Sequence, residues 1–191
     1  MNNSLPFVHK RASTLLTVLI CGLLSLLSSV AQAQLYYLMN DGAATTTLDE
    51  LRRTPLSAAS ETTLTNNVVD SPGTLAVDLA NNRILVASVR NNLPRIAAIS
   101  LSAPYTVTTF LTPAPVNGAT SSTLAGIAID NVNGYLYYLM NDGAATTTLD
   151  QLRRTPLSAA SETTLTNNVV DSPGTLAVDL ANNRILVASV R

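Results

Sequence analysis

The stretch TLAVDLANNRILVASVR occupies residues 74–90, and the same letters return at residues 175–191. Each copy begins with a short apolar segment that ends in aspartate, turns through alanine and asparagine, and continues into the apolar run Ile-Leu-Val-Ala. Such a run predicts a strand covered on both faces, because a half-exposed strand would alternate apolar and polar side chains. The stretch therefore predicts two strands joined by a polar turn.

This stretch belongs to a longer repeat. Residues 35–90 and 136–191 align at an offset of 101 residues and differ only where Glu50 is replaced by Gln151. We interpret the repeat as a young tandem duplication and its single difference as drift.

A shorter and weaker repeat lies inside the long one. Residues 74–89 resemble residues 126–140, and steps of 52 and 49 residues separate Asp78, Asp130 and Asp179. The basic unit is therefore about fifty residues long. A unit of this length built from short strands is typical of propeller blades rather than of helical hairpins.

Each complete unit contains four candidate strands, separated by turn residues. They are residues 75–78, 83–89, 95–101 and 105–111 in one unit, and 126–130, 135–140, 153–158 and 163–169 in the next. A partial unit precedes them with strands 35–39, 51–57 and 62–68. Asn133-Gly134 predicts a type I′ turn, in which both central residues need positive φ. Pro156 predicts a bulge or a shortened strand, because proline cannot donate to the ladder.

The phrases SPGTLAVDLANNRILVAS (71–88) and LAGIAIDNVNGYLYYL (124–139) resemble the blade signature of NHL and YWTD six-bladed β-propellers. The resemblance implies an all-β fold of four-stranded antiparallel blades, forming an incomplete, open propeller of about three blades. It also implies that Asp78, Asp130 and Asp179 brace the first hairpin of each blade; the alternative is that they are metal ligands. Because LVAS and LYYL stand where the letters YWTD would be, receptor-type ligand binding is not implied.

The first thirty-three residues have the composition of an export signal. A basic patch at 9–11 precedes the apolar run 15–27, and Ala31-x-Ala33 suits signal peptidase. We expect a helical secretory signal peptide over residues 1–33 and a secreted, periplasmic or cell-surface protein. An uncleaved membrane anchor is the alternative, although the apolar run is short for a span of about 20 residues.

Cleavage would remove the only histidine, cysteine and lysine, which are His9, Cys21 and Lys10. The remaining chain holds nine arginines against twelve acidic residues. This composition excludes a Ser–His–Asp triad, zinc sites built on histidine or cysteine, and histidine acid–base catalysis. A mildly acidic chain without a basic stripe also argues against nucleic-acid binding, and no membrane contact is expected beyond the export signal.

The predicted blades are incomplete at both ends of the repeat region. The blade segments are 34–73, 74–123, 124–173 and 174–191, of which the first has three expected strands and the last has two. Open radial faces and unpaired edges invite association. Two explanations stay open: this sequence is a fragment of a longer array, which we favour, or several copies complete a ring by self-association through open blade edges.

One face of a propeller gathers the loops between second and third strands and between fourth and first strands. Its candidate binding residues are Asp41, Asp49, Glu50, Asp70, Asp142, Asp150 and Asp171. Converging carboxylates suit calcium, but MNDGAATTTLD lacks the dense alternating oxygen ligands of a dedicated calcium loop. We therefore interpret them as solvated loop acids and expect no cofactor, with calcium as the alternative. The LYYLM segments (35–39 and 136–140) are expected to pack between blades.

The favoured function is that of an exported, non-catalytic binding scaffold for a protein, peptide or glycan. One alternative is a lactonase-like propeller hydrolase or lyase that holds a cation over the central channel. The other is a truncated product without an independent function.

Overall fold

The computed structural model describes residues 33–39, 49–57, 60–66, 68, 72–90, 93–116, 122–142, 150–159, 161–167, 169 and 173–189. The predicted signal peptide therefore lies outside the described residues, apart from Ala33. Where the chain is described it is almost entirely β-structure, with one 3-10 turn at Leu180–Asn182.

The strands form four separate antiparallel sheets, and within each sheet every strand pairs with its neighbour in sequence. Blade 1 contains β1 (Gln34–Met39), β2 (Glu50–Pro55) and β3 (Thr62–Thr65). Blade 2 contains β4 (Leu75–Asp78), β5 (Arg83–Arg90), β6 (Leu93–Ser100) and β7 (Val107–Leu111). Blade 3 contains β8 (Thr123–Asp130), β9 (Tyr135–Asn141), β10 (Gln151–Pro156) and β11 (Thr163–Thr166). Blade 4 contains β12 (Pro173–Asp179) and β13 (Arg184–Ser189).

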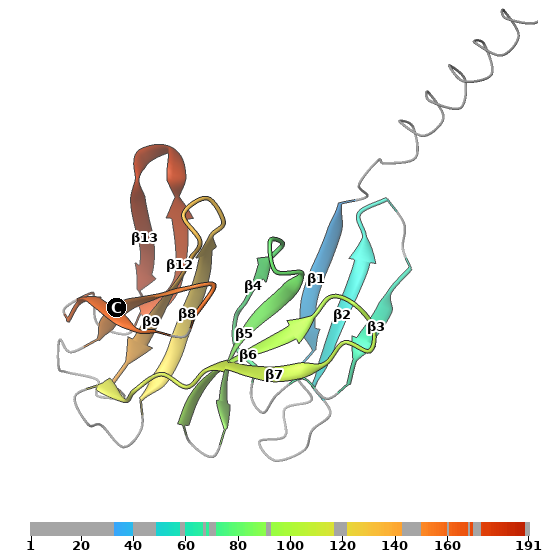
Figure 1. The fold of residues 1–191 in the computed structure, drawn as a ribbon, viewed down its shortest axis with the longest axis horizontal. Helices are drawn as coiled ribbons and strands as arrows, with labels where there is room; N and C mark the ends of the chain where they lie inside the picture. Colours follow the sequence, from blue (N-terminus) through green and yellow to red (C-terminus); the bar gives the residue numbers. More distant parts are fainter. Residues whose placement is uncertain are drawn as a thin grey trace, which may run out of the picture.

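The blades stand side by side in chain order, as Figure 1 shows, and the described strands form no closed ring. The first strands of blades 2, 3 and 4 lie next to one another, with β8 in contact with both β4 and β12. Leu75 pairs with Val86 of the adjacent strand, and Asp78 with Arg83. The predicted hairpin is confirmed, and the architecture is that of an open set of antiparallel blades, of which blades 2 and 3 have four strands.

Apolar side chains fill each of the three junctions between blades. Residues of β5 contribute to two junctions, because Ile84 and Val86 face blade 1 whereas Leu85 and Ala87 face blade 3. Ile84, Leu85 and Val86 are all fully buried, as the unbroken apolar run predicted. Successive side chains of a strand point to opposite faces, so one strand serves two cores.

The turn between first and second strands differs from the predicted type I′ turn, and that prediction is wrong. Only Gly134 has positive φ (+71°), and its N–H donates to the Asp130 carbonyl at 2.9 Å. Asn82 (φ 51°) and Asn183 (φ 49°) hold the equivalent place in blades 2 and 4. A four-residue turn that ends in a left-handed residue therefore recurs, at positions where glycine and asparagine tolerate that conformation.

The shortening predicted at Pro156 is confirmed, since β10 ends there and Pro156 pairs with Tyr135 of β9. The register shift against β11 lies earlier, between Leu152 and Arg153. Blade 2 has the same irregularity between Ile96 and Ala97, where no proline follows at that spacing. The bulge therefore belongs to the blade geometry, and the proline only ends the strand. Strands β3 and β11 also end three residues earlier than predicted, at Thr65 and Thr166.

Candidate binding face

Asp78 organises the turn between β4 and β5. Its carboxylate accepts hydrogen bonds from the Asn81 backbone N–H (3.2 Å) and from the Asn81 side chain (2.8 and 3.0 Å). It also forms an ion pair with the Arg83 Nε at 2.8 Å and is fully buried. The aspartate thus ties the turn to the start of the next strand.

Asp130 and Asp179 occupy the same place in blades 3 and 4. Asp130 accepts from the backbone N–H groups of Val132 and Asn133, both at 2.9 Å, and from the Asn133 side chain at 2.7 Å. Burial alone would raise the pKa of Asp130, but these hydrogen bonds outweigh burial and lower the pKa. Asp179 accepts from the Asn182 side chain (2.8 Å) and pairs with Arg184 (2.7 Å), and these bonds lower the pKa of its carboxyl.

Each of the three carboxylates is therefore engaged by donors of its own hairpin. This arrangement suits a structural role, because an ionised carboxylate with several donors holds a turn in one conformation. Among the described residues there is no group of three or more His, Cys, Asp or Glu side chains placed to hold a metal ion.

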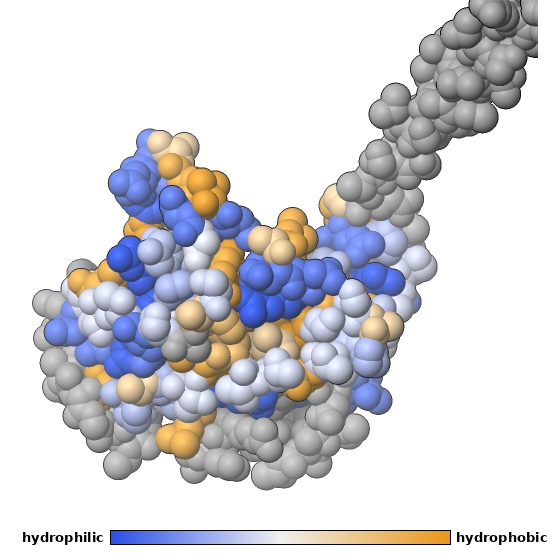
Figure 2. Space-filling view, in the orientation of Figure 1, coloured by the Kyte–Doolittle hydropathy of each residue, from blue (hydrophilic) through white to orange (hydrophobic). Residues whose placement is uncertain are grey.

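The tips of these hairpins carry exposed aliphatic side chains, which the sequence analysis missed. Leu79 is 72% exposed, Val132 77% and Leu180 46%. Figure 2 shows apolar atoms at the tips of the β4–β5 and β12–β13 hairpins. We call the surface formed by the three tips the hairpin-tip face. An aliphatic residue one or two places after each recurrent aspartate, inside an otherwise polar turn, was the available signal in the sequence.

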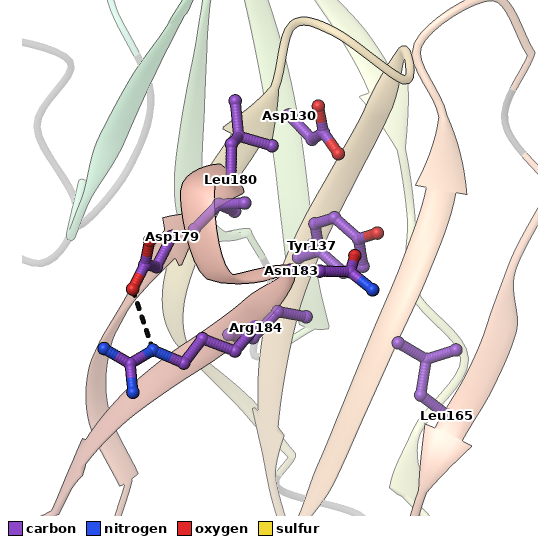
Figure 3. Close-up of a pocket in the computed structure, with 9 residues that line it drawn as sticks. Asp130, Tyr137, Leu165, Asp179, Leu180, Asn183 and Arg184 are labelled. Atoms are coloured by element: carbon purple, nitrogen blue, oxygen red, sulfur yellow. Dashed lines mark hydrogen bonds and ion pairs between the residues drawn. The ribbon is translucent and has the colours of Figure 1, made fainter.

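Two grooves lie on the hairpin-tip face, one at each junction between neighbouring tips. The groove between blades 2 and 3 has a volume of about 390 Å³ and is lined by residues that include Asn81, Asn133 and Tyr135. The groove between blades 3 and 4 has about 200 Å³. Figure 3 shows Asp130 and Tyr137 on one side of the second groove, facing the β12–β13 turn with Leu180. The first groove joins apolar surface to amide groups, and the second joins it to amide and charged groups.

A polar network lies away from this face, at the junction of blades 2 and 3. Tyr138 donates to Glu162 at 2.6 Å, and burial, followed by the Glu162 bond and charge, holds the pKa of Tyr138 far above its usual value. Arg153 donates to Glu162 (3.4 Å), to the Ala114 carbonyl (2.7 Å) and to Gln151 (2.7 Å). Gln151 and Arg153 are both only 5% exposed. The network joins blade 3 to the segment that leaves blade 2.

Blade 1 carries the copy of this network, built on Arg52. Arg52 pairs with Glu50 at 2.6 Å and with Glu61 at 3.1 Å, and the Arg52 and Glu50 side chains are 29% and 28% exposed. The neighbouring Glu61 carboxylate, then burial, raises the pKa of Tyr37. At the one position where the two repeats differ, the charged residue Glu50 therefore lies in the partly exposed copy and the neutral residue Gln151 lies in the buried copy.

Among the predicted loop-face acids, those that the structure describes do not form one solvated cluster. Asp41, Asp70 and Asp171 lie outside the described residues. Asp49, Asp142 and Asp150 are 1%, 8% and 3% exposed. The Asp150 carboxylate accepts from the Asp142 backbone N–H at 3.1 Å, and Glu50 pairs with Arg52. Their interpretation as solvated acids is wrong for Asp49, Asp142 and Asp150, because all three residues are buried.

The LYYLM segments pack between blades as predicted in blade 3 but only in part in blade 1, and the adjacent Arg153 and Arg154 of β10 lie in different surroundings. Arg153 is buried in the network, whereas Arg154 is half-buried and lies over the Tyr135 ring, 4.6 Å from its centroid. In blade 3, Leu136, Tyr138, Leu139 and Met140 are buried between blades. In blade 1 only one face of the same segment is covered, and Leu35 and Met39 are exposed.

No protein-family model matches the chain, and no characterised protein matches it in sequence. In structure it is similar to a nidogen/laminin complex, with TM-score 0.64 and 16% identity over 83% of this chain and 53% of that one. It is also similar to a gluconolactonase from Xanthomonas campestris (TM-score 0.58, 11% identity, 83% of this chain and 51% of that one). TolB from Acinetobacter baumannii matches with TM-score 0.52 and 14% identity over 92% of this chain and 40% of that one.

The fold is a β-propeller whose described blades form an open arc rather than a closed ring. All three similar structures are β-propeller proteins, and at these identities the likeness shows the fold alone. This chain spans about half the length of the first two and less of the third. The NHL or YWTD type of its repeat stays a prediction. In the part of the chain that the structure describes, no helix has the length and apolar character needed to cross a membrane.

Proposed function

We propose that this chain is an exported, non-catalytic binding module that holds a protein or peptide on its hairpin-tip face. The observation that carries this proposal is the row formed by Leu79, Val132 and Leu180, exposed at the tips of three neighbouring hairpins. Exposed aliphatic side chains that recur at one place on neighbouring blades are a candidate contact surface for another protein.

The hairpins beneath this row favour binding because their backbones are already held in place. Asp78, Asp130 and Asp179 each bind the backbone or side chains of their own turn, so little conformational freedom remains to be lost on association. The asparagine side chains of the turns offer both donors and acceptors to a peptide backbone. The grooves between the tips can receive side chains of a ligand, as pockets in protein interfaces do.

The similar structures are compatible with a binding role and with an enzymatic one. One of them is a complex of nidogen with laminin, and another is a gluconolactonase. The three hairpin aspartates, engaged by their own turns, favour the binding module over a cation-dependent lactonase. A peptide suits the face better than a glycan, because the tips present aliphatic rather than aromatic side chains. Export rests on the composition of residues 1–33.

A selection of random peptides displayed on phage tests the proposal. We expect enriched peptides to bind the chain and to lose at least about tenfold in affinity when Leu79, Val132 and Leu180 are all replaced by serine. These side chains are exposed, so the triple variant should fold and melt like the wild type.

Leu93→Ser is the matched control, because Leu93 is 49% exposed at the opposite end of blade 2, where the loop face lies. If this variant loses binding and the triple variant keeps it, the loop face carries the ligand and the hairpin-tip proposal is wrong. Selection without enrichment of any peptide would also contradict the proposal.

A further inference from the structure

Six of the buried side chains at the junction between blades 2 and 3 belong to the long repeat. Leu85 and Ala87 of β5 lie in one apolar cluster with Leu136, Tyr138 and Met140 of β9. The turn after β10 adds Leu157 to the same cluster. All six side chains are at most 6% exposed.

Every one of these six residues has a copy at an end of the described arc. Leu85 and Ala87 correspond to Leu186 and Ala188 of blade 4, and the other four correspond to Leu35, Tyr37, Met39 and Leu56 of blade 1. Four of these copies are well exposed: Leu186 is 47% exposed, Leu35 51%, Met39 45% and Leu56 69%, whereas Tyr37 is half-buried. The two ends therefore present the two halves of an interface that the molecule already contains.

We propose that two copies of this chain associate head to tail, with the outer face of blade 4 of one copy docked on the outer face of blade 1 of the other. The occupant of each open face is a second copy of this chain. What supports the proposal is residue-for-residue identity with the junction of blades 2 and 3, where the same side chains close on one another.

Among the described strands, the side-chain alternation of β1 and β13 turns these faces outward. Tyr36 and Leu38 of β1 pack against blade 2, so Leu35 and Met39 must point outward. Likewise, Ile185 and Val187 of β13 pack against blade 3 and turn Leu186 outward. The inner faces are already used, and the outer faces carry the matching set.

A polar contact of the internal junction also has its copy at the ends. Arg83 donates through Nη2 to the Leu157 carbonyl at 2.6 Å, across the junction of blades 2 and 3. Its copy Arg184 is paired with Asp179 through Nε, and its side chain is 59% exposed. In the proposed association the Arg184 guanidinium donates to the Leu56 carbonyl of the second copy.

The association is expected to be weaker than the internal junction. Ile96, Leu111 and Ile127 add to the internal cluster, and they belong to strands outside the repeated segments. Because the two docking faces differ, the contact is heterologous: repeated association closes a ring if the rotation allows and grows into an open series if it does not.

Sedimentation velocity of the full chain in mild detergent, at concentrations up to about 1 mM, tests the proposal. We expect the wild type to form species of two or more chains whose population rises with concentration. Leu35→Arg blocks the face of blade 1, Leu186→Arg blocks the face of blade 4, and each variant alone should remain a monomer.

The decisive measurement is the mixture of the two blocked variants. The intact blade 4 of Leu35→Arg can still dock on the intact blade 1 of Leu186→Arg, so the mixture should form a 1:1 dimer that grows no further. Leu93→Arg is the matched control, because Leu93 is 49% exposed in blade 2 and lies on neither face; it should associate like the wild type.

Several results would overturn the proposal. A wild type that stays monomeric over the whole range would leave the two faces to some other partner. Single variants that still associate, or a mixture that stays monomeric, would show that contact does not run from blade 4 to blade 1. Circular dichroism melting of each variant verifies that a loss of association is not a loss of folding.

Discussion

Replacing Gln151 by glutamate tests the electrostatic argument for the one difference between the repeats. Gln151 accepts from Arg153 Nε through Oε1 (2.7 Å) and donates from Nε2 to Asn167 Oδ1 (3.0 Å). A carboxylate keeps the first bond and strengthens it, but it has no proton for the second bond. Two acceptor oxygens would then face each other in a site where Gln151 is only 5% exposed.

The magnitude follows from the charges in the network. Arg153 already pairs with Glu162, so a second carboxylate beside Arg153 leaves the network with one negative charge in excess. A buried polar group left unsatisfied costs about 1–3 kcal/mol, and the stronger bond to Arg153 returns part of that. We expect Gln151→Glu to lower the free energy of unfolding by about 2 kcal/mol. For a chain of this size the melting temperature then falls by roughly 4–8 °C.

The chain supplies its own matched control. Glu50→Gln makes the reverse change in the copy of the network where Glu50 and Arg52 are partly exposed, and exposed ion pairs contribute little net stability. We expect its melting temperature, measured by differential scanning calorimetry, to stay close to that of the wild type.

The pH dependence separates charge from shape in this experiment. As the pH falls through its folded-state pKa, the introduced carboxyl gains a proton and can donate to Asn167 again, and below the ordinary glutamate pKa of about 4.3 it is protonated in the unfolded state as well. Because the charged form is the destabilising one, the folded-state pKa of this carboxyl is raised, and the difference from the wild type should narrow as the pH falls. Equal stability of Gln151→Glu and the wild type at neutral pH would refute the reasoning. A loss of stability that does not change with pH would assign the effect to packing instead.

Four further predictions concern single sites. Tyr138→Phe should lower the free energy of unfolding, measured with urea, by about 2 kcal/mol, because it removes the hydrogen bond to the Glu162 carboxylate. Since the folded-state pKa of Tyr138 is raised, the stability of the wild type should fall above about pH 10 more steeply than that of the variant. Asp130→Ala should lower the free energy of unfolding by about 2 kcal/mol at pH 7. The difference between wild type and variant should shrink below about pH 4, because the folded-state pKa of Asp130 is lowered and the stabilisation by its carboxylate is lost on acidification. Gly126→Ala should speed amide hydrogen exchange in β12 and β13, since its new Cβ would lie 3.1 Å from the Thr175 Cα. Gly174→Ala should not speed it, because its Cβ would lie 3.8 Å from the Ala188 carbonyl oxygen, an ordinary contact distance. Millimolar calcium should leave the melting temperature unchanged, and a clear increase would favour the cation-dependent alternative.

The pairing of strands could be predicted because it depends on local features of the sequence. The apolar run of β5 required cover on both faces, and the recurrent aspartate followed by asparagine or glycine required a tight turn next to it. Both features act within about twenty residues. The division into separate sheets followed from them, and the structure confirms it.

The environment of each strand could not be predicted in the same way, because identical residues lie in different surroundings. Leu85 is fully buried and its copy Leu186 is 47% exposed, although their local sequences are the same. The burial of Asp150 likewise depends on the blades around it rather than on its loop. The turn geometry was predicted wrongly for another reason. The dipeptide Asn133-Gly134 is typical of a type I′ turn, but each turn has a single left-handed residue at its end, which is Asn82, Gly134 or Asn183.

Because the two repeat copies are nearly identical but lie in different surroundings, they show which properties the sequence of a strand determines and which depend on its position in the array. The side chains of β5 and β13 specify two apolar faces, and only the number of neighbouring blades decides whether one or both are covered. In an array of this kind, stability is the sum of the intrinsic terms of the units and the terms of their junctions. Each further unit, whether it lies on the same chain or on a second copy, would convert an exposed Leu35 or Leu186 into a buried one without any change in sequence. The difference between Glu50 and Gln151 agrees with this dependence on neighbouring blades. The uncharged Gln151 lies in blade 3, where blade 2 covers the corresponding face, and the charged Glu50 lies in blade 1, where no described blade covers it.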